Sequence, residues 1–227
     1  MKIGVLLSGN GVFDGAEIQE AVSTLIALDK LGVEALCMAP NIDQHHVINH
    51  VTGSEMNEKR NVLVEAARIA RGTIKPLNEV NARNIDGLII PGGFGAAKNL
   101  STWALDGPAG DIEPETKRLI MEMVKAKKPI ASLCVSPVVI AKALQGSGIK
   151  TRLTIGTTEA ASPYDIKAFN QGLQSVGVEP VQCPLGEIVV DEANKIITSP
   201  CYMMEASISQ IYDGIYKACV KLVELAK

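Results

Sequence analysis

Strand-like apolar runs alternate with helical patterns along the chain, and this alternation limits the folds that the sequence can adopt. A repeated order of strand, helix and strand is typical of a parallel sheet with helices on both faces. The 227 residues suffice for one sizeable core, and the chain contains no linker, repeat or low-complexity tract. We therefore expect residues 1–227 to form a single α/β domain, a three-layer sandwich with a mostly parallel sheet.

The expected elements follow from apolar periodicity and from glycine, proline and capping residues. We expect strands at 3–8, 33–39, 87–91, 129–133 and 153–155, a hairpin of 187–190 with 195–198, and helices at 15–31, 58–71, 114–127, 138–144, 165–174 and 206–225. Ligands bind outside the carboxyl ends of such strands. The site is therefore expected in the loops 9–14, 91–99, 134–136, 156–162 and 199–203.

Composition excludes several classes of function. The net charge is −3 and no long basic run occurs, so we expect no nucleic acid and no membrane as partner. The five cysteines are widely spaced and never in a C-x-x-C pair, which argues against a disulfide framework and a zinc site. A reducing cytoplasm is the expected setting. The 47% hydrophobic content favours a buried oligomer face, and we expect a homodimer.

Cys134 lies at a strand–turn–helix corner. The apolar run 129–133 predicts a buried strand, Ser136 is a good N-cap, and Pro137 fits the first helical position. Such a corner is a nucleophile elbow, which directs the sulfur to the carboxyl edge of the sheet. The helix start would stabilise a thiolate, so we expect a thiol pKa below about 8.5. A buried, inert cysteine is the alternative.

Two glutamates at the start of the first helix are candidate acids. Asp14 and Glu17 have the spacing of a capping box with Asp14 as N-cap, so a structural role is favoured for Glu17. Glu20 lies one turn further, beside residues that we expect to face the sheet, namely Ala21, Val22, Leu25 and Ile26. A carboxyl desolvated near Cys134 would have a raised pKa and could donate a hydrogen bond or move protons.

Glycines follow two of the strands. The stretch 91–95, Pro-Gly-Gly-Phe-Gly, can form an anion-binding nest or an oxyanion hole, or a plain tight turn. Gly9, Gly11 and Gly15 weakly match a dinucleotide loop, but the acid expected at the end of the second strand is missing. The three histidines, at 45, 46 and 50, are expected to be solvated loop residues rather than metal ligands.

Together these segments resemble the ThiJ/PfpI superfamily, relatives of class I glutamine amidotransferase domains. The match is closest to the ElbB branch, which is named for enhancing lycopene biosynthesis and described as glyoxalases. The resemblance covers essentially the whole chain and is strongest at 15–20, 91–100, 153–157 and 188–198. It implies a flavodoxin-like fold of the class I glutamine amidotransferase type.

The resemblance also implies roles for individual residues. Cys134 would be the reactive cysteine and Glu20 the acid bonded to it, with the oxyanion site at Gly92, Gly93 and Val135. Many members carry a histidine in the strand after the elbow helix, where this chain has Gly156, and no histidine follows Cys134. Protease and amidase activity are thereby disfavoured. Glu159, a few residues on, is a candidate to substitute for the histidine, and Glu17 is a further candidate site residue.

The implied activity is that of a glutathione-independent glyoxalase III-like lyase, without metal or other cofactor. Small reactive dicarbonyls would be converted, glyoxal to glycolate, through a Cys134 hemithioacetal with Glu20 as proton shuttle. One alternative is a redox-sensing or protein-binding module in which Cys134 oxidises to a sulfinate. Another is an amidotransferase-like hydrolase, which the missing histidine disfavours.

Overall fold

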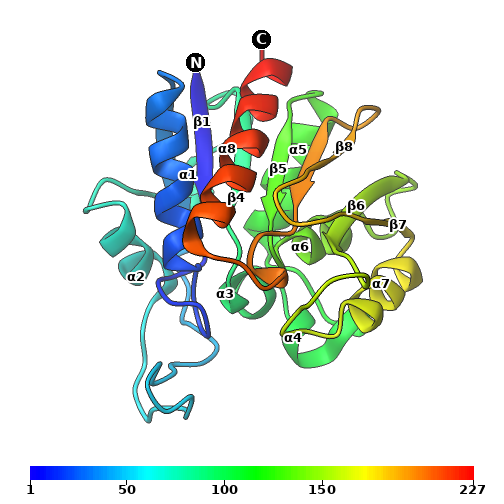
Figure 1. Cartoon of the computed structure of the whole chain (residues 1–227). Coiled ribbons are helices and arrows are strands. Elements are labelled where there is room, and N and C mark those ends of the chain that lie inside the picture. Colours follow the sequence, from blue (N-terminus) through cyan, green and yellow to red (C-terminus); the bar gives the residue numbers. More distant parts are fainter.

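A seven-stranded sheet crosses the middle of the protein in the computed structural model, which describes residues 1–227 (Figure 1). The strand order is β3-β2-β1-β4-β5-β9-β8, and all neighbours are parallel except β8, which is antiparallel to β9. The strands are β1 (Lys2–Leu6), β2 (Glu34–Ala39), β3 (Lys75–Pro76), β4 (Gly87–Ile90), β5 (Ile130–Leu133), β6 (Thr151–Gly156), β7 (Val178–Gln182), β8 (Val189–Asp191) and β9 (Ile196–Ser199).

Helices cover both faces of this sheet. Figure 1 shows α1 and α8 side by side on one face, with α5 and α6 on the other. The helices are α1 (Ile18–Lys30), α2 (Val62–Ile69), α3 (Phe94–Lys98), α4 (Trp103–Asp106), α5 (Pro114–Lys125), α6 (Pro137–Leu144), α7 (Ile166–Ser175) and α8 (Ile208–Leu225), with 3₁₀ turns η1 (Leu77–Glu79), η2 (Gly107–Ala109) and η3 (Cys201–Met203). The predicted α/β three-layer fold with a mostly parallel sheet is confirmed.

The central strands β4, β5 and β9 are buried along their whole length, since helices lie above and below them. This is why they appear in the sequence as continuous apolar runs and not as alternating patterns. No helix in the structure combines the length and the apolarity that a membrane crossing requires.

The strand predicted at 153–155 is longer and lies outside the main sheet. It is β6, which pairs in parallel with β7 in a separate two-stranded sheet. The edge of β9 is already occupied by β8, so β6 reaches β9 through a side chain: the Thr154 N–H donates to Thr198 Oγ1 at 3.0 Å. The strand β7 was not predicted, because Pro180 lies within it and a proline is tolerated in a strand only at a sheet edge.

The first helix begins later than predicted, and the face that it buries is not the one we expected. Its N-cap is Glu17, not Asp14, and the carboxylate of Asp14 instead accepts the N–H of Ile48 at 2.7 Å. Ala21 is buried as expected, but Val22 and Ile26 are 39% and 44% exposed. The expectation that both face the sheet is wrong, because the buried face of α1 carries Glu20 and Thr24 in their place.

Candidate functional site

Cys134 occupies a strained corner between β5 and α6. Its φ is 57°, in the left-handed region that a residue with a side chain rarely adopts, and such a residue costs about 1–3 kcal/mol. The Cys134 N–H donates to the carbonyl oxygen of Ser199 at 2.9 Å, which ties the corner to the end of β9. The predicted elbow is therefore present, with the sulfur at the carboxyl edge of the sheet.

Ser136 holds this corner in a way that the sequence did not indicate. It stands at the predicted N-cap of α6, but its side chain makes no capping hydrogen bond. Its hydroxyl oxygen accepts the N–H of Leu133 at 2.8 Å and lies 2.8 Å from the Ile90 carbonyl oxygen and 2.7 Å from Ser132 Oγ. These buried contacts join β4, β5 and the elbow, so they help to offset the strain at Cys134.

Glu20 projects from the first turn of α1 into the interior and is 0% exposed. Its carboxyl group accepts the Gly92 N–H at 2.9 Å and the Tyr202 N–H at 3.3 Å. Burial raises the pKa of Glu20 to about 8, and the nearby Glu17 carboxylate adds to the rise, although the hydrogen bonds from Tyr202, Gly92 and the Cys134 thiol oppose it. Glu20 is therefore mostly protonated at neutral pH, while its ionised form remains accessible there.

The Cys134 thiol is not the activated thiolate that we expected. Only 5% of the residue is exposed, and burial raises its pKa well above the usual value, with the Glu20 carboxylate and Cys201 adding to the rise. The hydrogen bond from the Gly93 N–H acts in the opposite direction but is outweighed. No cationic side chain is among the groups that act on the sulfur. Cys134 and Glu20 therefore form a pair in which both members hold their protons at neutral pH.

Gly92 lets the pair meet. A Cβ atom on Gly92 would lie 2.4 Å from Cys134 Cβ, 2.9 Å from Cys134 Sγ and 2.6 Å from Glu20 Oε2, so no side chain fits there. The backbone N–H of Gly93 points to the sulfur, and the N–H of Val135 donates to no backbone oxygen. N–H groups without a backbone partner are what an oxyanion site needs, and the assignment of that site to Gly93 and Val135 stays a prediction.

Gly93 is required for a reason other than substrate approach. Its φ is 95°, and a Cβ atom would lie 2.3 Å from the Glu17 nitrogen and 2.4 Å from the Gly15 oxygen. The clash is thus with the backbone that precedes α1, not with the space in front of the sulfur. A larger residue at this position would disturb folding as well as the site.

The two further candidates differ in position. Glu17 is 9% exposed, accepts the N–H of Glu20 at 2.6 Å, and has a pKa raised by burial. It therefore belongs to the buried carboxyl pair at the start of α1. Glu159 is exposed and its N–H donates to Thr157 Oγ1, so its side chain is not brought to Cys134.

The place where we expected the family histidine is filled from another segment. Gly156 has a φ of 135°, and a Cβ atom there would lie 2.6 Å from Met204 Sδ. The N–H of Thr157 lies 3.5 Å from the same sulfur. A thioether cannot serve as a base, so no group of this kind assists Cys134 from β6. No group of three or more histidine, cysteine or acidic side chains is arranged to hold a metal ion.

Other site residues were not found from the sequence. Tyr164 lies close enough for Cys134, Glu20 and Glu17 to raise its pKa, after burial as the main cause. Cys201 has a φ of 45° and a thiol pKa raised by burial and by Glu20. Only their position in or beside the loops 156–162 and 199–203 could have indicated them, since these loops were expected at the carboxyl edge.

A cleft of about 530 Å³ opens beside this pair. It is lined by Val12, Phe13, Glu17, Gln19, Pro163, Tyr164, Tyr202, Met204, Glu205 and Ala206. Two of these residues also touch the pair: Tyr202 donates to Glu20, and Glu17 accepts from the Glu20 backbone. The cleft thus lies beside the two glutamates at the start of α1, and Tyr164 in its wall is near enough to Cys134 for the thiol to act on its pKa.

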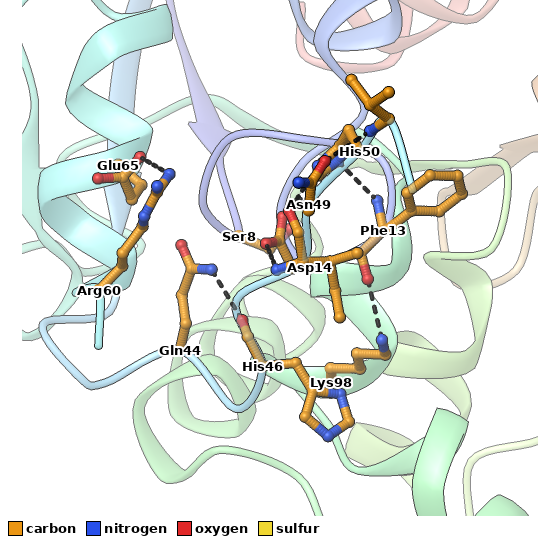
Figure 2. Close-up of polar contacts among 12 residues, drawn as sticks. Ser8, Phe13, Asp14, Gln44, His46, Asn49, His50, Arg60, Glu65 and Lys98 are labelled. Carbon is orange, nitrogen blue, oxygen red and sulfur yellow. Dashed lines mark hydrogen bonds and ion pairs between the residues drawn. The ribbon is translucent and has the colours of Figure 1, made fainter. Parts of the chain in front are cut away.

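The backbone of Phe13 is held by hydrogen bonds to the side chains of His50 and Lys98, as Figure 2 shows. His50 Nε2 accepts the Phe13 N–H at 3.2 Å, and Lys98 Nζ donates to the Phe13 oxygen at 2.9 Å. The rings of Phe13 and His50 lie 4.9 Å apart. His50 therefore has a structural role, since it supports one wall of the cleft.

Comparison with known proteins agrees with this geometry. The model of the DJ-1/PfpI family matches residues 11–200. The ES1 protein homolog, mitochondrial, of Rattus norvegicus is 40% identical over 99% of this chain and 84% of its own length. The human glutamine amidotransferase-like class 1 domain-containing protein 3, mitochondrial, is 40% identical over 99% of this chain and 83% of its own length.

Solved structures extend the comparison. An isoprenoid biosynthesis protein with amidotransferase-like domain from Ehrlichia chaffeensis is 36% identical, with a TM-score of 0.90 and full coverage of both chains, 100% each. DJ-1beta of Drosophila melanogaster is 17% identical with a TM-score of 0.56, covering 99% of this chain and 88% of its own, and shares the fold.

The names of the relatives correct one expectation and the family match confirms another. The relatives from rat, human and zebrafish are all named as mitochondrial, which contradicts the expected cytoplasmic location. Free, widely spaced cysteines argue only against a disulfide framework and do not distinguish one reducing compartment from another. The family model covers most of the sequence, including the elbow and the glycine loop 91–95. This chain belongs to the DJ-1/PfpI family.

Proposed function

We propose that this chain is a cofactor-independent glyoxalase that converts glyoxal and related small dicarbonyls to 2-hydroxy acids. The observation that carries the proposal is Glu20, a fully buried carboxyl with a pKa of about 8. Its Oε2 and the Cys134 sulfur both lie within 3.0 Å of the position that a Cβ atom on Gly92 would take, at 2.6 and 2.9 Å. A group whose pKa lies close to the working pH can both accept and donate a proton. Isomerisation of a dicarbonyl needs a group of this kind.

The first step forms a bond between Cys134 and the substrate. The Glu20 carboxylate accepts the thiol proton as the sulfur adds to one aldehyde carbon of glyoxal. The aldehyde oxygen becomes an oxyanion held by the N–H groups of Gly93 and Val135. Glu20 then returns the proton to this oxygen, which gives a neutral hemithioacetal and restores the carboxylate.

The second step moves hydrogen between carbons. The Glu20 carboxylate removes the hydrogen from the carbon bonded to sulfur, which leaves an enediolate. Glu20 then delivers that proton to the neighbouring carbon, and the hydroxyl proton passes to the other oxygen. The product is a glycoloyl thioester of Cys134. Water cleaves the thioester and regenerates the thiol, so that one glyoxal and one water give one glycolate and one proton.

The raised pKa of Cys134 favours this scheme over a resting redox sensor. Peroxide oxidises thiolates, and a thiol that keeps its proton at neutral pH reacts slowly. In the glyoxalase scheme the base removes the thiol proton only when substrate is present. The amidotransferase-like alternative lacks its base, because Met204 takes the place of the histidine.

Formation of glycolate from glyoxal tests the proposal. We expect Cys134→Ser to abolish turnover, and Glu20→Gln to lower kcat by about 10²–10⁴. For the wild type, kcat/KM should rise with pH as Glu20 ionises and level off above about 8. Turnover by Cys134→Ser equal to that of the wild type would exclude the mechanism.

The homodimer is retained as part of the proposal. Its support is a stripe of exposed apolar side chains one helical turn apart on α1, formed by Ile18, Val22 and Ile26, which are 45%, 39% and 44% exposed. Light scattering measures the oligomeric state directly, and a monomer at all concentrations would contradict this part.

A further inference from the structure

The cleft lined by Glu17, Tyr164 and Tyr202 lies next to the buried pair of Cys134 and Glu20 and is more open than that pair. Cys134 is only 5% exposed, so a substrate can present little more than its reacting end to the sulfur. The remainder of a larger substrate has to stay outside, and the adjoining space is the cleft of about 530 Å³. The lining of the cleft therefore determines which substituents the site accepts.

The walls of the cleft are apolar and aromatic. Phe13, Tyr164 and Tyr202 contribute rings, and Val12, Pro163 and Met204 contribute further apolar surface. Phe13 is 38% exposed although its backbone is held firmly by His50 and Lys98, so its ring is available for a ligand (Figure 2). Apolar area removed from water stabilises a complex in proportion to that area.

The charges in the cleft are of one sign. Glu17 and Glu205 line it, and no lysine, arginine or histidine does. Glu17 forms no ion pair, and neither does Glu205. Sites for phosphate or carboxylate groups contain arginine, lysine or free helix N–H groups. An anionic substituent would find none of these cationic partners and would be repelled by the two carboxylates.

We propose that this cleft selects neutral 2-oxoaldehydes with an apolar or aromatic substituent and rejects anionic ones. This inference rests on the proposed glyoxalase function, whose substrate class it narrows. The aldehyde carbon reaches Cys134, and the substituent on the neighbouring carbonyl packs against Phe13 and Tyr164. For phenylglyoxal, one substrate and one water give one mandelate and one proton, with the hydrogen moved from the aldehyde carbon to its neighbour.

Three substrates of graded chemistry test the selection: glyoxal, phenylglyoxal and 4-carboxyphenylglyoxal. We expect kcat/KM for phenylglyoxal to exceed that for glyoxal by about 10-fold or more, from the apolar area of the ring. The carboxylate of the third compound should lower kcat/KM about 10-fold relative to phenylglyoxal, from repulsion at moderate dielectric. Phe13→Ala should reduce the ratio of kcat/KM for phenylglyoxal to kcat/KM for glyoxal, because the variant loses the ring against which the substituent packs.

Charge variants isolate the electrostatic part. Glu205→Gln should reduce the difference in kcat/KM between phenylglyoxal and 4-carboxyphenylglyoxal. Glu224→Gln removes the same charge from an exposed position in the last turn of α8, away from the cleft, and should leave this difference unchanged. A difference that is insensitive to Glu205→Gln, or equal changes in both variants, would overturn the electrostatic argument.

Binding of unreactive analogues separates this inference from the catalytic proposal. Acetophenone and 4-acetylbenzoate carry the same ring without the aldehyde. Their binding to the Cys134→Ser protein is measured by calorimetry, whether or not the wild type turns over any dicarbonyl. Tighter binding of acetophenone supports the cleft assignment even if no dicarbonyl is turned over, in which event only the proposed function fails. Equal or tighter binding of 4-acetylbenzoate, or turnover of glyoxal without preference for phenylglyoxal, refutes the inference.

Discussion

Glu20→Gln should change the pH dependence of stability in a defined direction. The pKa of Glu20 is about 8 in the folded protein, against an ordinary value of 4.5 that we assign to the unfolded chain. Between these values the native state binds more protons than the unfolded state, so this carboxyl lowers the stability of the wild type as pH rises. Below about 4.5 the effect vanishes, and above about 8 it is complete.

The magnitude follows from the two pKa values. Each unit of pKa difference corresponds to about 1.4 kcal/mol, so between pH 5 and pH 7.5 the wild type should lose about 3 kcal/mol through this group. Glutamine cannot ionise and does not have this loss. The glutamine side chain has only one oxygen, so one of the two N–H donors, from Gly92 or Tyr202, has no good acceptor. This lowers the free energy of unfolding by about 1–3 kcal/mol at every pH.

Urea unfolding of wild type and variant at pH 5 and pH 7.5 measures the effect. We expect the free energy of unfolding of Glu20→Gln, relative to wild type, to become more favourable by about 3 kcal/mol between the two pH values. Glu224→Gln, at an exposed position, serves as the control and should show no such change. A relative stability of Glu20→Gln that is constant with pH would refute the raised pKa and the proton shuttle built on it.

Four further predictions concern the elbow and the surface. Gly92→Ala should lose most glyoxal turnover, because the added Cβ would lie 2.4 Å from Cys134 Cβ, while circular dichroism should show that the fold persists. Gly32→Ala is the control and should keep its activity, since a Cβ atom at this position would have no other atom within 4 Å. Ser136→Ala should lower the urea-derived free energy of unfolding by about 1–3 kcal/mol, since buried partners lose a hydrogen bond, and an unchanged value would contradict this. Iodoacetamide should label Cys134 of the wild type appreciably only at alkaline pH, and the labelling rate of Glu20→Gln should rise at lower pH because one carboxylate that raises the thiol pKa is gone. Fast labelling of the wild type at pH 7 would show that Cys134 is an activated thiolate after all. Val22→Glu should convert the proposed dimer to monomer in light scattering, and an unaffected dimer would place the interface elsewhere.

The sequence by itself determined the order of elements and the edge of the sheet at which the site forms. Continuous apolar runs predicted β4, β5 and β9, and the turn 191–194 predicted the β8–β9 hairpin, because these signals are local. The same local signals placed Cys134 at a strand–helix corner. Local patterns also made Glu20 and the glycine loop candidates, the family resemblance assigned their roles, and the structure brings both to that corner.

Only the tertiary structure decided how the site ionises and what surrounds it. The pKa of Glu20 depends on complete burial and on donors from Gly92 and Tyr202, which are distant in sequence. The predicted activation of Cys134 failed because desolvation outweighs the N–H donor at the elbow. The contact of Met204 with Gly156 and the hydrogen bond from Phe13 to His50 likewise join segments that are distant in sequence. No local pattern encodes such contacts.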